Sequence, residues 1–169
     1  MPQVISPEIM LRAAGIRLLL MDCDGVMTDG RLYFSASGEQ MKVFHVRDGQ
    51  GIVNWHNAGF VSGIISGRGA DDILAERARE LGIKYVRTNS KDKVADLYDI
   101  LISEQVSADE VAFIGDDIGD ISLMKVVGLP VAVADAVSEV ADTAVLQTKA
   151  PGGSGAIREL IEVLLAAKG

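Results

Sequence analysis

The sequence predicts an α/β fold built on a Rossmann-like, mostly parallel sheet flanked by helices, with a small β-hairpin inserted after the first strand. Two observations support this prediction. Short apolar runs alternate along the chain with segments of helical periodicity, and most of these runs are nearly continuous, as in strands buried on both faces. No repeat, low-complexity tract or linker interrupts the 169 residues, so we expect one domain over residues 1–169.

The first elements are a helix, a strand and the hairpin. Ser6 followed by Pro7 is typical of a helix start, and the helix is expected to end near residue 14. Residues 16–21 are apolar except for Arg17 and are expected to form a buried strand. Within residues 31–46, two apolar runs flank a turn rich in serine and glycine, which predicts a β-hairpin.

Helices and strands alternate through the rest of the chain. Asp48 is expected to cap the next helix, and Gly59 and Gly82 to end two of the helices. Helices are predicted at residues 48–58, 70–81, 92–103, 118–127 and 155–167. Strands are predicted at residues 60–65, 84–86, 111–114, 131–134 and 144–146.

Composition excludes several classes of function. Lys and Arg total 16 and Asp and Glu total 24, so the net charge is −8. A chain this acidic is a poor candidate for nonspecific binding to nucleic acid or to an anionic membrane, and we expect neither partner. One cysteine and two histidines exclude an intrachain disulfide and argue against a Cys- or His-based zinc site. The chain lacks a secretory signal and any apolar run near the ~20 residues that a membrane span needs, which predicts a cytoplasmic protein.

Acidic residues follow two of the predicted strands. Asp22 and Asp24 come directly after the first strand, and Asp116, Asp117 and Asp120 follow the strand at 111–114. The carboxyl ends of parallel strands meet at one edge of a sheet, so these carboxylates should converge there. They would repel one another unless a cation neutralised them, and oxygen ligands without His or Cys favour Mg²⁺.

Hydroxyl and cationic groups are expected at the same edge. Ser66 and Arg68 follow the strand at 60–65, and Lys93 lies at the start of the helix at 92–103. Together with the acids, these residues resemble the four ordered motifs of the haloacid dehalogenase (HAD) superfamily. The motifs read Asp22-x-Asp24-Gly-Val, Ser66, Lys93 and Gly115-Asp116-Asp117-x-x-Asp120.

This resemblance covers nearly the whole chain and implies a Mg²⁺-dependent phosphatase. Most phosphatases of the superfamily carry a cap domain after the first or third strand. Here the first interval holds only the hairpin, and the interval between Arg68 and Lys93 holds one helix and one strand, which resembles the capless branch. In that branch a homotetramer places the hairpin region of one subunit over the site of its neighbour, so we expect a homotetramer.

The resemblance implies catalytic roles for four residues. Asp22 is the expected nucleophile and forms an aspartyl-phosphate. Asp24 is the expected general acid for the leaving oxygen and then the general base for water. Ser66 and Lys93 are expected to stabilise charge on the phosphoryl oxygens.

It implies a metal site in the same place. The expected ligands of Mg²⁺ are Asp22, Asp116 and the backbone carbonyl of Asp24. Asp117 and Asp120 are expected to orient metal-bound waters or Lys93.

Further segments resemble the phosphatases of 3-deoxy-D-manno-octulosonate 8-phosphate (KDO 8-phosphate), an intermediate in the synthesis of a lipopolysaccharide sugar. These segments read DCDGVMTDG, FHVRDGQG, SGR, VAVADA and GGSGAIRE. Val53 stands where related enzymes often have a basic residue, so nine-carbon sugar-acid phosphates of the sialic-acid type are the alternative substrates. The expected substrate contacts are Asp24, His45, Val46, Arg47, Asp48, Gly49, Arg68, Arg77 and Lys93.

Other interpretations of these residues stay open. Asp22 and Asp24 could cap a turn, and Asp116 could cap a helix. Asp117 and Asp120 could be first-turn acids favoured by the helix dipole. At the level of function, the chain could be a non-catalytic oligomerisation domain or a phospho-accepting regulator domain. The first would have lost a nucleophile or ligand, and the second would lack an acid two residues after its phosphorylated Asp.

Overall fold

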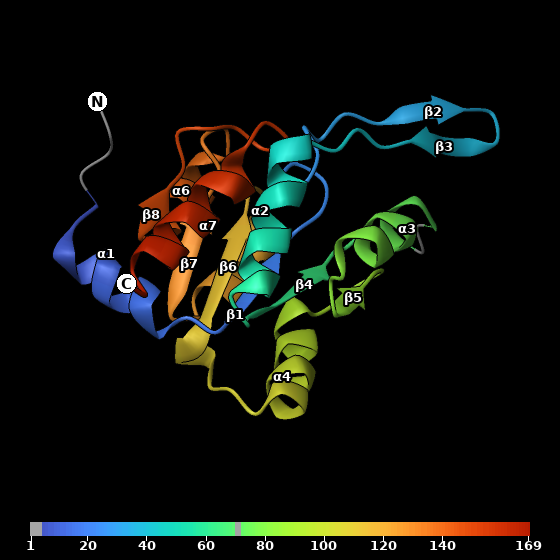
Figure 1. The fold of residues 1–169 in the computed structure, drawn as a ribbon. Helices are drawn as coiled ribbons and strands as arrows, with labels where there is room; N and C mark the ends of the chain where they lie inside the picture. Colours follow the sequence, from blue (N-terminus) through green and yellow to red (C-terminus); the bar gives the residue numbers. More distant parts are fainter. Residues whose placement is uncertain (1–4, 70–71) are drawn as a thin grey trace.

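A six-stranded parallel sheet forms the centre of the molecule in a computed structural model that describes residues 5–69 and 72–169 (Figure 1). The strand order is β5-β4-β1-β6-β7-β8, and every neighbouring pair runs parallel. The strands are β1 (Leu18–Met21), β4 (Val61–Ile65), β5 (Tyr85–Arg87), β6 (Val111–Gly115), β7 (Leu129–Ala132) and β8 (Leu146–Gln147). The predicted α/β class and parallel sheet are confirmed.

The apolar run of β1 is continuous because both of its faces are buried. Leu19 and Met21 pack into one hydrophobic cluster, whereas Leu18 and Leu20 pack into the other. Side chains alternate between the two faces of a strand, so four consecutive apolar residues are what a central strand requires.

Helices cover both faces of the sheet. Residues of four helices pack into the first cluster, and α2 lies beside α7 (Figure 1). These helices are α1 (Pro7–Gly15), α2 (Val46–Asn57), α3 (Asp72–Leu81) and α7 (Ala156–Ala166). On the second cluster lie α4 (Lys93–Glu104), α5 (Ile121–Met124) and α6 (Ser138–Thr143). None of the described helices combines the length and the apolar character that a membrane crossing needs.

The expected hairpin is present after the first strand. Its strands, β2 (Tyr33–Ser35) and β3 (Gly38–Met41), pair antiparallel and project away from the central sheet (Figure 1). In the described part of the chain no cap domain accompanies it, as the sequence predicts.

Several predicted elements differ in the structure. The helix expected at 118–127 is a 3-10 turn, Ile118–Asp120, followed by the single turn of α5, because side chains of the turn bond back to its own backbone. The helix α6 and a 3-10 turn at Ala108–Glu110 were not predicted. For the helix expected at 70–81, residues 70 and 71 lie outside the described residues.

Asp48 does not cap its own helix, so that prediction is wrong. α2 begins at Val46 with His45 at its N-cap position. The buried carboxylate of Asp48 instead accepts hydrogen bonds from the backbone N–H groups of Gly155, at 3.1 Å, and Arg158, at 2.8 Å. Asp48 therefore satisfies backbone N–H groups at the N-terminus of α7, whose N-cap residue, Gly155, has no side chain to do so.

The loop after β1 packs tightly against the loop before α7. Gly153 donates its backbone N–H to the carbonyl of Val26 at 2.9 Å, and Gly152 lies directly against the backbone of Gly25. A side chain at position 152 would overlap the carbonyl oxygen of Gly25. The two loops therefore fix each other's position.

We expect Gly152→Ala to lower the free energy of unfolding by about 1–3 kcal/mol, because a backbone must move to admit the methyl group. Urea denaturation measures the change. Gly15→Ala is the matched control: nothing lies within 4 Å of its added methyl group, so its stability should stay the same or rise. Equal unfolding midpoints for wild type and Gly152→Ala would show that the two loops are not in close contact.

Candidate active site

A pocket of about 250 Å³ lies where three strands of the sheet end. Asp22 and Asp24 follow β1, Ser66 follows β4, and Asp116 follows β6. Lys93 reaches the same pocket from the first residue of α4. The pocket is lined by Asp22, Asp24, Ser66, Gly67, Arg68, Lys93, Asp116, Asp117, Gly119 and Asp120. The structure thus brings the residues of all four motifs together.

Lys93 connects two of the acids. Its Nζ lies 3.0 Å from Asp22 Oδ1 and 2.7 Å from Asp120 Oδ1. The other oxygen of Asp120 accepts hydrogen bonds from the backbone N–H groups of Asp116, at 3.0 Å, and Asp117, at 3.3 Å. Asp120 therefore holds both the ammonium group and the loop that carries Asp116.

The carboxylates of the pocket fit a divalent cation. Oxygens of Asp22, Asp116 and Asp120 lie within 4.8 Å of one another. The Oδ1 atom of Asp116 is buried and accepts no hydrogen bond from the described residues. Since the oxygens of Asp120 are engaged by Lys93 and backbone N–H groups, Asp22 and Asp116 are the acids best placed to bind a hard cation such as Mg²⁺.

Burial and mutual repulsion perturb both of these acids. Desolvation and the charges of Asp22, Asp120 and Asp117 raise the pKa of Asp116 to about 8. Desolvation and the charge of Asp120 raise the pKa of Asp22 to about 6, although Lys93 opposes that shift. A cation between the two carboxylates would remove the cause of the repulsion.

Asp24 is held from the side of the hairpin. Its Oδ1 accepts a hydrogen bond from Lys42 Nζ at 2.7 Å, and its Oδ2 lies 3.4 Å from Arg68 Nε. Glu39 pairs with both cations, at 3.1 Å to Lys42 and 2.9 Å to Arg68. Lys42 and Glu39 were not predicted from the sequence, because their spacing is ordinary for a hairpin and only the folded chain brings them to Asp24.

Ser66 is placed by the end of β4. Its backbone N–H donates to the carbonyl of Arg87 on β5 at 2.8 Å, which continues the sheet by one residue. The Ser66 side chain is nearly buried and accepts a hydrogen bond from the backbone N–H of Arg68 at 3.4 Å. The hydroxyl is therefore fixed at the wall of the pocket.

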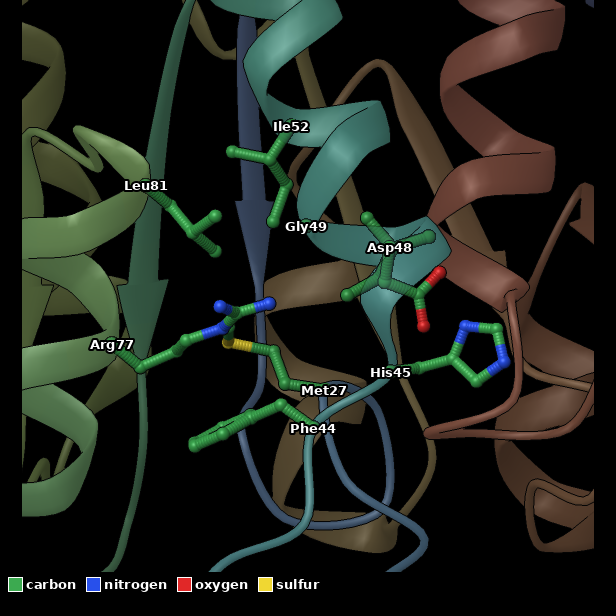
Figure 2. Close-up of a pocket in the computed structure, with 9 residues that line it drawn as sticks. Met27, Phe44, His45, Asp48, Gly49, Ile52, Arg77 and Leu81 are labelled. Carbon is green, nitrogen blue, oxygen red and sulfur yellow. The ribbon is translucent and has the colours of Figure 1, made fainter.

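The remaining predicted substrate contacts lie outside this pocket within one chain. His45, Asp48, Gly49 and Arg77 line a second, very small cavity between α2 and α3 (Figure 2). Figure 2 shows Arg77 reaching from α3 toward α2, and its guanidinium lies 5.6 Å from the centre of the Phe44 ring. Neither His45 Nδ1 nor Arg77 Nε, both buried, has a hydrogen-bond partner among the described residues.

Arg47 and Val46 lie elsewhere again. Arg47 lines a surface hollow at the start of α7, together with Ser154 and Arg158. The side chain of Val46 is among the most exposed large apolar groups of the described residues. Within one chain, the segment 45–49 therefore does not contribute to the pocket of Asp22.

Comparison with known proteins gives consistent results. A family model described as haloacid dehalogenase-like hydrolase matches residues 64–160. The 3-deoxy-D-manno-octulosonate 8-phosphate phosphatase KdsC of Yersinia pestis is 41% identical over 164 residues, which are 97% of this chain and 87% of that protein.

Two solved structures of such phosphatases match the fold. The Yersinia pestis phosphatase superimposes with a TM-score of 0.94 at 41% identity, over 97% of this chain and 88% of that one. The Moraxella catarrhalis phosphatase, in complex with magnesium ion, phosphate ion and KDO, gives a TM-score of 0.93 at 30% identity, over 97% and 94% of the two chains. The chain therefore belongs to the haloacid dehalogenase-like hydrolases and, within them, to the family of the 3-deoxy-D-manno-octulosonate 8-phosphate phosphatases.

Proposed function

We propose that this protein is a Mg²⁺-dependent phosphatase that hydrolyses KDO 8-phosphate to KDO and inorganic phosphate. The observation that carries the proposal is the pocket in which Asp22, Asp24 and Asp116 meet Ser66 and Lys93. The likeness to KDO 8-phosphate phosphatases over nearly the whole chain supports the choice of substrate.

In this proposal Asp22 is the nucleophile. A phosphomonoester is hydrolysed extremely slowly without a catalyst. The carboxylate of Asp22 attacks phosphorus and forms an aspartyl-phosphate while the sugar oxygen leaves. Lys93, 3.0 Å from Asp22, offsets charge on the nucleophile and the phosphoryl oxygens, and Ser66 donates to those oxygens.

Asp24 transfers protons in both half-reactions. It first donates a proton to the leaving sugar oxygen and then accepts one from the water that cleaves the aspartyl-phosphate. Asp22, Asp116 and the backbone carbonyl of Asp24 would hold Mg²⁺, which supplies neutralising charge to the phosphoryl group when bound. Arg68 lines the same pocket, and its guanidinium fork suits the carboxylate of a sugar acid.

A nine-carbon sugar-acid phosphate is the alternative substrate. The departure at Val53 motivates it, yet Val53 lies on α2 and packs against the hydrophobic core rather than lining the pocket. The presence of valine instead of a basic residue at position 53 therefore leaves the groups around Asp22 unchanged.

We also propose that the protein acts as a homotetramer in which the hairpin region covers a neighbour's pocket. Monomeric proteins rarely expose large contiguous apolar patches. Apolar side chains are exposed along the hairpin and the segment after it, at Leu32, Phe34, Met41, Val43 and Val46. In this arrangement the segment 45–49 reaches substrate across the subunit boundary. A single domain and a cytoplasmic location remain predictions from the sequence.

We expect Asp22→Asn to reduce phosphate release from KDO 8-phosphate by at least about a thousandfold, because the amide cannot attack phosphorus. Phosphate release with Mg²⁺ measures the loss, and EDTA should abolish release by the wild type. Asp99→Asn, the same change at an exposed position on α4, should retain full activity. Persistent phosphate release by Asp22→Asn would show that Asp22 is not the nucleophile. Wild-type activity on nine-carbon sugar-acid phosphates alone would show that KDO 8-phosphate is not the substrate.

We expect Mg²⁺ to raise the melting temperature more at pH 8 than at pH 6. In the metal-free protein the pKa of Asp116 is raised to about 8 and that of Asp22 to about 6, above the ordinary value of 3.8. The stability contributed by these groups is complete below the ordinary value and is lost as pH rises through the raised values. Mg²⁺ binds the ionised forms, so its stabilising effect grows over the same range.

Thermal unfolding with Mg²⁺ and with EDTA measures this difference. Asp116→Asn is the control, because the variant lacks the acid with the most perturbed pKa and should lose most of the pH-dependent effect. An equal effect of Mg²⁺ at both pH values in the wild type would contradict the assignment of Asp116 as a ligand.

We expect light scattering to give a molar mass of about four times 17.9 kDa. Phe34→Asp, which places a charge among the exposed apolar side chains of the hairpin, should dissociate the assembly and lower activity without changing the pocket. Ile102→Asp is the matched control, since Ile102 is 78% exposed on α4, away from the hairpin. A monomeric wild type at micromolar concentration would exclude the tetramer.

A further inference from the structure

Lys42 is a buried cation at the base of the hairpin. It is the residue that follows β3, and its side chain is only 1% exposed. Burying an ammonium group is unfavourable unless acidic partners compensate for the lost hydration. Asp24 and Glu39 are such partners, with oxygens 2.7 and 3.1 Å from Lys42 Nζ.

Lys42 contacts Asp24 from outside the pocket. The pocket is lined by Asp24 and Arg68, but Lys42 is not among its lining residues. The ammonium group of Lys42 therefore acts on Asp24 and does not face the space where a substrate would bind.

The two oxygens of Asp24 have different surroundings. Oδ1 accepts the short hydrogen bond from Lys42, whereas Oδ2 is buried, accepts no hydrogen bond from the described residues and lies 3.4 Å from Arg68 Nε. An ammonium group has donors and no acceptor, so Lys42 donates to the carboxylate of Asp24 and fixes its orientation through Oδ1.

We propose that Lys42, held by Glu39, is a positioning residue that fixes the orientation of the Asp24 carboxylate through Oδ1. The inference rests on the proposed function of Asp24 as general acid and base. In that function a proton passes from Asp24 to the sugar oxygen as the bond from that oxygen to phosphorus breaks and the bond from Asp22 to phosphorus forms. In the second half-reaction Asp24 takes a proton from water as the water oxygen bonds to phosphorus and the bond to Asp22 breaks.

Glu39 connects Lys42 and Arg68 to the hairpin. Its Oε1 pairs with Lys42 and its Oε2 pairs with Arg68, so one carboxylate orients both cations that flank Asp24. A general acid must lie within hydrogen-bond reach of the leaving oxygen, and fixed partners maintain that geometry. The hairpin thus positions a group of the pocket although its strands project away from the sheet (Figure 1).

The test compares Lys42→Met with the wild type on substrates that differ in leaving group. A sugar alkoxide needs a proton as it leaves, whereas p-nitrophenolate is stable without one. For KDO 8-phosphate we expect kcat/KM to fall by about 10- to 100-fold, which is less than full loss of a general acid can cause. For p-nitrophenyl phosphate we expect kcat/KM to fall by less than about threefold, because this leaving group does not need a proton from Asp24 when phosphate is transferred to Asp22.

Two further variants complete the test. Arg31→Met removes the same charge beside the hairpin, from a side chain that is 80% exposed, and should leave both rates unchanged. Glu39→Gln should show the pattern of Lys42→Met in weaker form, and it tests the inference if Lys42→Met does not fold. Equal losses on both substrates, or no loss on KDO 8-phosphate, would overturn the inference.

The outcome is separable from that of the proposed function. If the wild type does not release phosphate from KDO 8-phosphate, the proposed substrate is wrong. Phenyl phosphate and p-nitrophenyl phosphate then serve as the comparison, since phenolate is the stronger base and needs the proton more. A larger loss on phenyl phosphate in Lys42→Met supports the role of Lys42, and equal losses overturn it.

Discussion

Repulsion among the carboxylates at one edge of the sheet is the constraint around which the rest of the site is organised. Burial alone disfavours the charged form of Asp116, and the neighbouring acids add to the effect. Lys93 lies 3.0 Å from Asp22, and Lys42, outside the pocket, lies 2.7 Å from Asp24. A divalent cation would complete the compensation at Asp116 Oδ1, a buried atom that accepts no hydrogen bond from the described residues.

The register of the sheet brings these groups together. Met21 of β1 aligns with Ile64 of β4 and with Ile114 of β6, so the three strands end at nearly the same level. Asp22 directly follows Met21. Ser66 lies two residues after Ile64, and Asp116 lies two residues after Ile114. A shift of one residue would turn each of these side chains to the other face, and the buried apolar residues of β1 on both faces oppose such a shift.

The strand ends explain why much of this site could be predicted from the sequence. Asp22, Asp24, Ser66 and Asp116 follow apolar runs whose burial is local information, and a parallel sheet places run ends together. The partners of Lys42 and Asp48 depend instead on how distant segments meet. Asp48 accepts hydrogen bonds from backbone N–H groups more than 100 residues away in the sequence, and no sequence pattern near Asp48 predicts that contact. The short turns of the second half of the chain escaped prediction for a related reason, since they depend on side chains that bond to nearby backbone.

The hairpin takes part both in the proposed subunit association and in holding Asp24. Its apolar side chains are exposed, with Phe34 at 64%, whereas Glu39 and Lys42 turn toward Asp24. A two-stranded hairpin has little stability of its own, so its position depends on what it contacts. Within one chain those contacts include the ion pairs to Asp24 and Arg68, and in a tetramer they would include the neighbouring subunit. Phe34 pairs directly with Glu39 across the hairpin, so burying Phe34 against a neighbouring subunit would also restrict Glu39. Subunit association would then help to order the ion pairs that hold Asp24.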